Sequence, residues 1–254
     1  MKLTQNFSLT LGIATFSTLS VMAAPGYIDG SLTTGSQSVN LSAIGTTDWT
    51  IWGYANSGTS TSLAPDDSLS GGSGISGLTY SNPNSQPLRG IGQFDVNYAF
   101  SWNNGGTVAS ASGAYAGLQA DTAVGPGEGV NEAFSFTVPA TTAEQQLDVF
   151  VDVNSAVGEL TASLSGGGVS SYVNDAIPYG GNSPGEYVID FAAATPGQTL
   201  TVEWLETSAL ETSDNPAICA AALSPVPEPA TWALVAGGAL MLVGFSRRKA
   251  DAGR

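Results

Sequence analysis

The sequence predicts an all-β protein: an antiparallel β-sandwich of jelly-roll type, with an N-terminal signal peptide and a single C-terminal transmembrane helix. Three observations predict the sandwich. Apolar residues recur at every second position in several short segments, which is the period of a strand with one buried face. Glycine, serine, asparagine and proline fill the intervals, as they do in turns. No stretch between the two ends of the chain shows sustained helical periodicity, and many short strands with polar turns are typical of a sandwich.

The first element is a signal peptide at residues 1–23. Lys2 is the only early charge, and the run from Phe7 to Met22 is uncharged and largely apolar. The residues before the expected cut follow a small-x-small pattern that ends at Ala23. Because Pro25 would block a cut after Ala24, we predict cleavage between Ala23 and Ala24 by a signal peptidase. The β-sandwich ectodomain is then expected at residues 24–224.

Seven segments of this region carry the strand alternation: 94–102, 134–138, 146–154, 160–164, 187–191, 200–204 and 218–223. The first is the clearest, with large apolar residues at five alternate positions: Phe94, Val96, Tyr98, Phe100 and Trp102. Residues 71–77, 166–168 and 178–185 are expected to be turns or loops. Residues 31–85 have the weakest pattern, and two interpretations stay open for them: a looped half of the sandwich, or a poorly ordered lead-in.

The charge of the expected ectodomain is strongly negative. It holds 19 of the 21 acidic residues of the chain and, of the six basic residues, only Arg89, so its net charge is −18. Such a surface repels phosphate groups, so we expect no nucleic-acid partner. Cations or cationic polymers are the partners that this charge favours.

The absence of histidine and the presence of a single cysteine exclude several kinds of site. The chain has no histidine, so it has no Ser-His-Asp or Cys-His nucleophile and no zinc site with a histidine ligand. Cys219 is the only cysteine, which excludes an intramolecular disulfide. Because Cys219 lies within an apolar strand segment, it is expected to be a small buried residue. A glycosidase would need only a pair of carboxylates, and this alternative stays open.

Sugar binding is suggested by a cluster of aromatic residues. Trp49, Trp52 and Tyr54 follow one another closely, and on a strand Trp49 would face one side while Trp52 and Tyr54 face the other. One indole could then lie in solvent and stack on a sugar ring. The alternative is that both faces of this strand are covered and the aromatic residues belong to the core.

Oxygen ligands for calcium are the only metal ligands that the sequence offers, and no cofactor is expected otherwise. Asp148 and Asp152 lie on the polar face of the segment 146–154, and Asp66 and Asp67 are adjacent. The favoured interpretation of Asp148 and Asp152 is the solvent-facing side of a sheet. Gly72–Gly77 matches a dinucleotide-binding pattern, but no strand–helix frame surrounds it, so a flexible loop is expected.

The last thirty residues combine three features in a fixed order. Val226, Pro227, Glu228 and Pro229 form a rigid extended motif, because each proline fixes φ and supplies no N–H. The run Ala230–Phe245 has no charge and would span about 24 Å as a helix. The basic residues that follow place the end of the chain in the cytoplasm and would stop translocation: Arg247, Arg248 and Lys249.

These three features resemble the PEP-CTERM sorting signal of Gram-negative bacteria. The resemblance covers residues 225–254, with the motif at 226–229, a transmembrane helix at 230–246 and a basic tail at 247–254. It implies that a membrane-embedded exosortase recognises and cleaves the chain near Pro227–Pro229. It also implies transient anchoring in the inner membrane, followed by transfer to the cell surface or extracellular matrix.

Together these features predict a non-enzymatic, exported structural or adhesion protein associated with extracellular polysaccharide. The alternative is a carbohydrate-binding β-sandwich module, and a carboxylate-based glycoside hydrolase is the third candidate.

Overall fold

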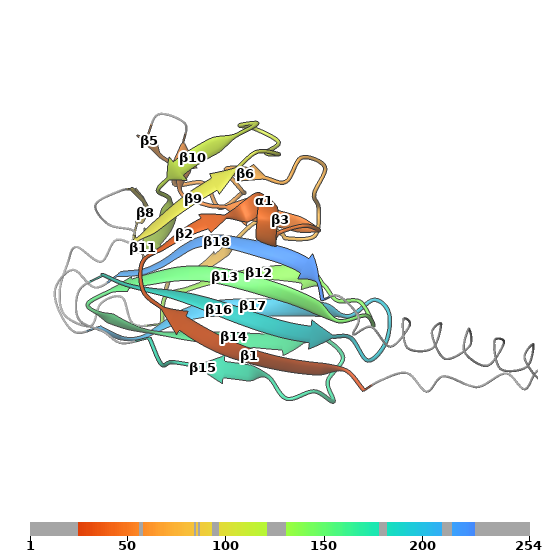
Figure 1. Cartoon of the computed structure of the whole chain (residues 1–254). Coiled ribbons are helices and arrows are strands. Elements are labelled where there is room, and N and C mark those ends of the chain that lie inside the picture. Colours follow the sequence, from red (N-terminus) through yellow and green to blue (C-terminus); the bar gives the residue numbers. More distant parts are fainter. Residues whose placement is uncertain are drawn as a thin grey trace, which may run out of the picture.

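Two β-sheets packed face to face form the body of the protein, and a smaller sheet covers the outer side of one of them (Figure 1). The computed structural model describes residues 25–55, 58–83, 85, 87–92, 97–120, 131–177, 182–209 and 215–226. All regular structure in these ranges is β except one four-residue helix, α1 (Leu41–Ile44). The predicted all-β class is therefore confirmed, and the two main sheets are consistent with the predicted antiparallel β-sandwich.

The larger sheet, here called the central sheet, has eight strands. Its main order is β1 (Tyr27–Thr34), β16 (Asn182–Ala192), β13 (Gln145–Asn154), β18 (Asn215–Pro225), β11 (Gly117–Ala120) and β8 (Leu88–Ile91). Strand β3 (Asp48–Ile51) also pairs with β18, and β6 (Asp67–Ser68) pairs with β3. Every pair in this sheet is antiparallel.

The second sheet, here called the outer sheet, has five strands. Its order is β15 (Tyr172–Asn174), β14 (Ala156–Leu164), β17 (Thr199–Ala209), β12 (Ala133–Pro139) and β7 (Thr79–Ser81). The strands from β11 to β18 pair in a nested way across both sheets: β11 with β18, β12 with β17, β13 with β16, and β14 with β15. This nesting, in which a long hairpin is wrapped over two layers, is typical of a jelly roll.

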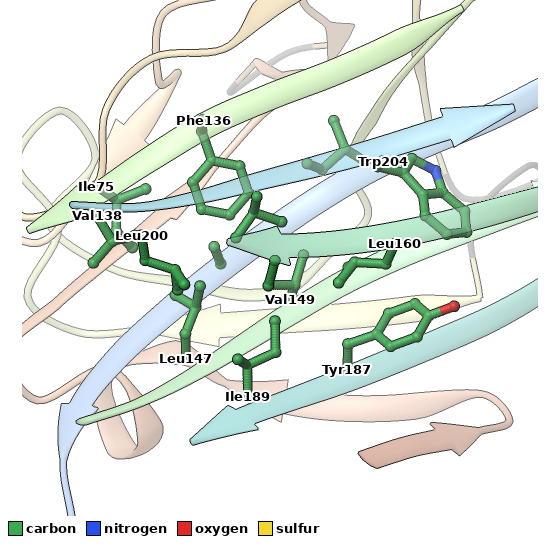
Figure 2. Packing of buried hydrophobic residues seen from close by; sticks show 14 of the residues in the cluster. Ile75, Phe136, Val138, Leu147, Val149, Leu160, Tyr187, Ile189, Leu200 and Trp204 are labelled. Atoms are coloured by element: carbon green, nitrogen blue, oxygen red, sulfur yellow. The ribbon is translucent and has the colours of Figure 1, made fainter. Parts of the chain in front are cut away.

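The main hydrophobic core lies between the central and outer sheets. Alternate residues of β13 (Leu147, Val149, Val151 and Val153) pack against the outer sheet and are fully buried. Figure 2 shows Leu147 and Val149 facing Leu160 and Leu200, with Tyr187 beside Trp204 at one end of the cluster. The inward faces of these strands follow the period-two alternation of the sequence, which is why the sequence predicts them well.

A third layer, here called the cover sheet, buries the opposite face of the central sheet. It consists of β10 (Ala111–Ala114), β9 (Tyr98–Trp102) and β2 (Gln37–Asn40), next to helix α1. The rings of Tyr98 and Phe100 from β9 lie edge-on to Phe150 of β13, with centroids 5.3 Å and 5.6 Å apart. Alanines of β18 and Cys219 complete this second core. A separate pair, β4 (Tyr54–Ala55) with β5 (Gly58–Thr59), lies outside these sheets.

The predicted strands agree with the observed ones in the described ranges. Segments 134–138, 146–154, 160–164, 187–191, 200–204 and 218–223 all lie within strands of the two main sheets. The segment 94–102 contains β9, although residues 93–96 lie outside the described residues. One loop prediction is wrong in part, because residues 182–185 belong to β16; the strand begins there since β13 provides pairing partners as far as Asn154.

The region 31–85 is a looped, but structured, part of the sandwich. It provides β2, α1, β3, β6 and β7, and each of these elements is short, which explains the weak alternation of the sequence. Its longest loop is held by a buried carboxylate. Asp48 accepts hydrogen bonds from the backbone N–H groups of Gly74 (2.6 Å) and Ile75 (2.9 Å), and also from Trp49 (2.9 Å).

The loop that carries the glycine pattern, residues 72–77, thus binds a carboxylate of the same chain. A Cβ atom at Gly72 would lie 2.0 Å from Oδ1 of Asp48, so only glycine allows this close approach. The prediction of a flexible loop is corrected here: consecutive backbone N–H groups bind Asp48, and Ile75 is buried in the main core.

Replacing Asp48 should therefore loosen this loop. We expect Asp48→Ala to lower the melting temperature, because each buried N–H left without an acceptor costs about 1–3 kcal/mol. Hydrogen exchange should become faster at residues 74 and 75. Asp48→Asn keeps one acceptor oxygen and should have a smaller effect, and Glu203→Ala on the exposed face of β17 is the control. Unchanged exchange at these two amides in Asp48→Ala would contradict the assigned role.

Candidate functional site at the chain exit

The last described strand leads directly to the predicted sorting motif. Strand β18 is hydrogen-bonded on both sides, by β13 along one edge and by β11 and β3 along the other. It ends at Pro225, opposite Gln145, and the N–H of Val226 then donates to the carbonyl of Glu144 (3.1 Å). The chain is therefore fixed to the sandwich as far as Val226, and Pro227 is the first residue beyond this contact.

The other end of the domain begins at the same place. Strand β1 starts at Tyr27, opposite Ala192 at the end of β16, and Phe191 is opposite Gln145. Figure 1 shows the start of β1 and the end of β18 on the same side of the molecule. Since β16 and β13 separate these strands, the two exits are about 14 Å apart, three strand spacings. We call this end of the sandwich the sorting end.

Gly26 packs the incoming chain tightly against the sandwich. A Cβ atom at this position would lie 2.6 Å from the backbone nitrogen of Ala194, so the chain is already held against the body one residue before β1. Only Ala24 and Pro25 would precede this contact after the predicted cleavage. Both exits of the sorting end are thus fixed in position by backbone contacts.

Three carboxylates surround Tyr27 at the sorting end. Asp29 of β1 lies directly opposite Asp190 of β16, and Glu144 accepts a hydrogen bond from the Tyr27 hydroxyl. Partial burial, followed by the charges of Glu144 and Asp29, raises the pKa of Asp190. Burial and the hydrogen bond to Glu144 also raise the pKa of Tyr27. Asp29, Glu144 and Asp190 are called the acidic trio below.

No local pattern in the sequence predicts the acidic trio. Its members come from β1, the loop before β13, and β16, so they lie far apart along the chain. Only the strand register brings them together. An acidic pair such as Asp29 and Asp190 could have been found from the sequence only if the pairing of β1 with β16 had been known.

The predicted terminal segments lie outside the described residues. These are the signal peptide (1–23, with Ala23 and Ala24 at its cut), the motif residues Pro227, Glu228 and Pro229, the transmembrane helix (230–246), and Arg247, Arg248 and Lys249. The described part of the chain contains no helix that could span a bilayer.

The predicted sugar-stacking residues are mostly internal. Trp49 and Trp52 are both fully buried, so the expectation that one indole faces solvent is wrong. Trp49 packs on Trp102 in the second core, and Trp52 packs on Phe136 in the main core. Both faces of β3 are covered because it lies between two packed layers. Tyr54 is half-buried, and its ring lies edge-on to Trp102.

The two calcium candidates on β13 are also buried, so the interpretation of this face as solvent-facing is wrong. Asp148 and Asp152 are each 2% exposed. The physical reason is the cover sheet, which packs over this face of the central sheet. Gln146 donates to both carboxylate oxygens of Asp148 (3.0 Å and 3.2 Å), and the N–H of Asn97 donates to Oδ2 of Asp152 (3.3 Å).

Other carboxylates bind the backbone. Asp67 accepts hydrogen bonds from the N–H groups of Ser68 (2.8 Å), Thr107 (2.9 Å) and Val108 (2.9 Å). Burial raises the pKa of the neighbouring Asp66.

Among the described residues, no group of three or more Asp, Glu, Cys or His side chains is arranged to hold a metal ion. Cys219 is a buried, free cysteine, as predicted.

Burial changes the ionisation of both β13 carboxylates. It raises the pKa of Asp152 to about 7 and that of Asp148 to about 6. The hydrogen bond from Gln146 opposes the shift of Asp148, whereas the charges of Glu186 and Asp190 add to it. Since the folded state holds these protons more tightly than the unfolded state, the free energy of unfolding should fall as the pH rises from about 4 to about 7.

We therefore expect Asp152→Asn to stabilise the protein at pH 8. The neutral amide avoids the cost of a buried charge, about 1.4 kcal/mol for each unit of pKa shift as an upper bound. The melting temperature of the variant should exceed that of the unmodified protein by several degrees at pH 8 and approach it at pH 4. Glu203→Gln, which removes an exposed charge, is the control. A variant that melts lower at pH 8 would show that the charged form is the stable one.

Comparison with known proteins identifies the tail. Residues 225–249 match the family model described as the PEP-CTERM protein-sorting motif. No curated protein matches the chain.

Two solved structures share a distant likeness with the fold. One is the enzymatically active domain of tailspike protein 4 from bacteriophage CBA120, with 11% identity and a TM-score of 0.38, covering 60% of this chain. This chain spans only 20% of that protein. The other is TmCBM61 in complex with β-1,4-galactotriose, with 11% identity and a TM-score of 0.36, covering 59% of this chain and 88% of that one. Neither likeness bears on ligand or activity here. What the comparisons establish is that residues 225–249 of this chain form a PEP-CTERM sorting motif, which begins where the last described strand ends.

Proposed function

We propose that this chain is an exported, non-enzymatic protein of the cell surface or extracellular matrix, with a jelly-roll ectodomain that an exosortase-type membrane enzyme releases or transfers. The observation that carries the proposal is the PEP-CTERM motif at residues 225–249. The role of the tail is that of a substrate: Pro227, Glu228 and Pro229 form the recognition element, and residues 230–246 hold the precursor in the inner membrane. Arg247, Arg248 and Lys249 stop translocation.

The arrangement of the chain ends supports a precursor with two membrane segments. A signal peptide before Ala24 and a membrane helix after Pro229 would both leave the sandwich from the sorting end, about 14 Å apart. The domain could therefore fold while both segments are still in the bilayer. Signal peptidase would remove the first segment, and the exosortase-type enzyme the second.

The extracellular role is proposed to be structural or adhesive, in association with exopolysaccharide. The net charge of −18 favours cationic matrix components or ions over nucleic acid and anionic surfaces. No specific observation favours the carbohydrate-binding alternative, because Trp49 and Trp52 are buried and Tyr54 packs on Trp102. Calcium binding by Asp148 and Asp152 is not part of the proposal. Polysaccharide hydrolysis by the mature protein would contradict the non-enzymatic assignment.

Cleavage of the chain at the sorting motif can be tested by measuring the mass of the mature protein. In a host with an exosortase-type enzyme, we expect the surface-delivered protein to begin at Ala24 and to lack the tail up to Arg254. Replacing Pro227, Glu228 and Pro229 together with alanine should leave the tail attached and the protein in the membrane fraction. Intact-mass spectrometry of both fractions measures this outcome.

The matched control is Pro83→Ala with Glu203→Ala, which removes the same residue types from exposed positions of the ectodomain. This variant should be processed like the unmodified chain. A mature protein that keeps residues 230–254 in the unmodified chain, or that loses them equally in the motif variant, would refute the proposed sorting function.

A further inference from the structure

The distance between the folded domain and the membrane is limited by the chain itself. The backbone is bound to the sandwich up to Val226, and the expected membrane segment begins at Ala230. Four fully extended residues span at most about 14 Å. If the tail is a membrane segment, as the proposed function holds, the sorting end must lie at the level of the lipid headgroups. The inference that follows rests on this function.

The cleavage motif lies within this short gap. Pro227, Glu228 and Pro229 fill it completely, so no spacer separates the motif from the sandwich. An enzyme embedded in the membrane that cuts there must approach to within a few residues of β18. It cannot reach the motif without facing the sorting end, because the pairing of β18 with β13 holds the sandwich in place up to Pro225.

We propose that the sorting end is a docking surface for the processing enzyme, and that a basic protein surface of that enzyme contacts it. The acidic trio gives this surface its charge. Asp29 and Glu144 are exposed, Asp190 is half-buried, and Glu144 is also the residue whose carbonyl holds Val226. The trio therefore lies at the point where the chain leaves the domain.

The negative charge of the acidic trio favours a basic enzyme surface over the lipid headgroups as the partner of the sorting end. Like charges placed directly opposite on neighbouring strands, such as Asp29 and Asp190, destabilise the sheet. Anionic headgroups would add to this repulsion, whereas a basic surface would relieve it. The only basic residue of the expected ectodomain, Arg89, lies on β8 at the opposite edge of the central sheet from β1.

The experiment compares processing rates of the full-length precursor in membranes that contain the enzyme. Asp29→Asn, Glu144→Gln and Asp190→Asn are combined in one variant. The control combines Glu159→Gln, Asp175→Asn and Glu203→Gln, which changes the net charge equally and also includes two exposed residues and one half-buried residue. We expect the trio variant to be cleaved roughly five- to tenfold more slowly and the control at the unmodified rate, since charge pairs at an interface act mainly on association.

Two further measurements separate docking from other effects. Added salt should slow cleavage of the unmodified precursor but not of the trio variant, because it screens charges at the contact. A flexible spacer of about twelve Gly and Ser residues between Val226 and Pro227 should abolish the difference between trio variant and unmodified sequence, because it lets the motif move away from the domain. Melting temperatures of the two variants that are no lower than that of the unmodified precursor would show that the variants fold, and relief of the repulsion between Asp29 and Asp190 should raise that of the trio variant.

The outcomes distinguish this inference from the proposed function. No cleavage of the unmodified precursor would refute the proposed function, and the docking surface with it. Normal cleavage of the trio variant, or a slowing that the control variant shares, would overturn the docking surface alone. Faster cleavage of the trio variant would overturn it as well, and would identify repulsion from the anionic membrane as the effect of the trio.

Discussion

The structure depends on one constraint: the last described strand, β18, is an internal strand of the central sheet. Strand β18 has hydrogen-bonded neighbours on both edges and packed layers on both faces. Its run of small residues fits this position, because alanine and cysteine side chains let Trp49 and the cover sheet approach closely. A sheet with its middle strand at the C-terminal end is complete only when the chain is in place up to Pro225.

Burial on both faces also explains the unusual chemistry of β13. A strand with one solvent face can place aspartates there at no cost, but the cover sheet removes that solvent. Asp148 and Asp152 are then retained in the interior with raised pKa values, held by Gln146 and Asn97. Asp48 and Asp67 are buried too, but each accepts hydrogen bonds from three backbone N–H groups. The interior thus contains carboxylates that hold the loops between the layers.

The same constraint links the fold to the sorting motif. Because β18 is fixed as far as Val226, the first two residues of the matched sorting motif are held by contacts with the sandwich. Strand β1 begins at the same end, so the sorting end gathers both chain exits and the acidic trio. Sequence alone could place the sorting motif, but it could not show that β1 begins at the end of the sandwich where β18 ends.

The sequence by itself determined where most of the long strands of the two main sheets lie, the burial of Cys219 and the identity of the tail. Alternation along one strand, or a motif of adjacent residues, is local information. Tertiary structure alone decided that Trp49, Trp52, Asp148 and Asp152 are internal, that the loop at 72–77 binds Asp48, and that the acidic trio assembles at the chain exit. These features depend on contacts between strands that are distant in sequence, and a local pattern cannot show which layer will cover a given face.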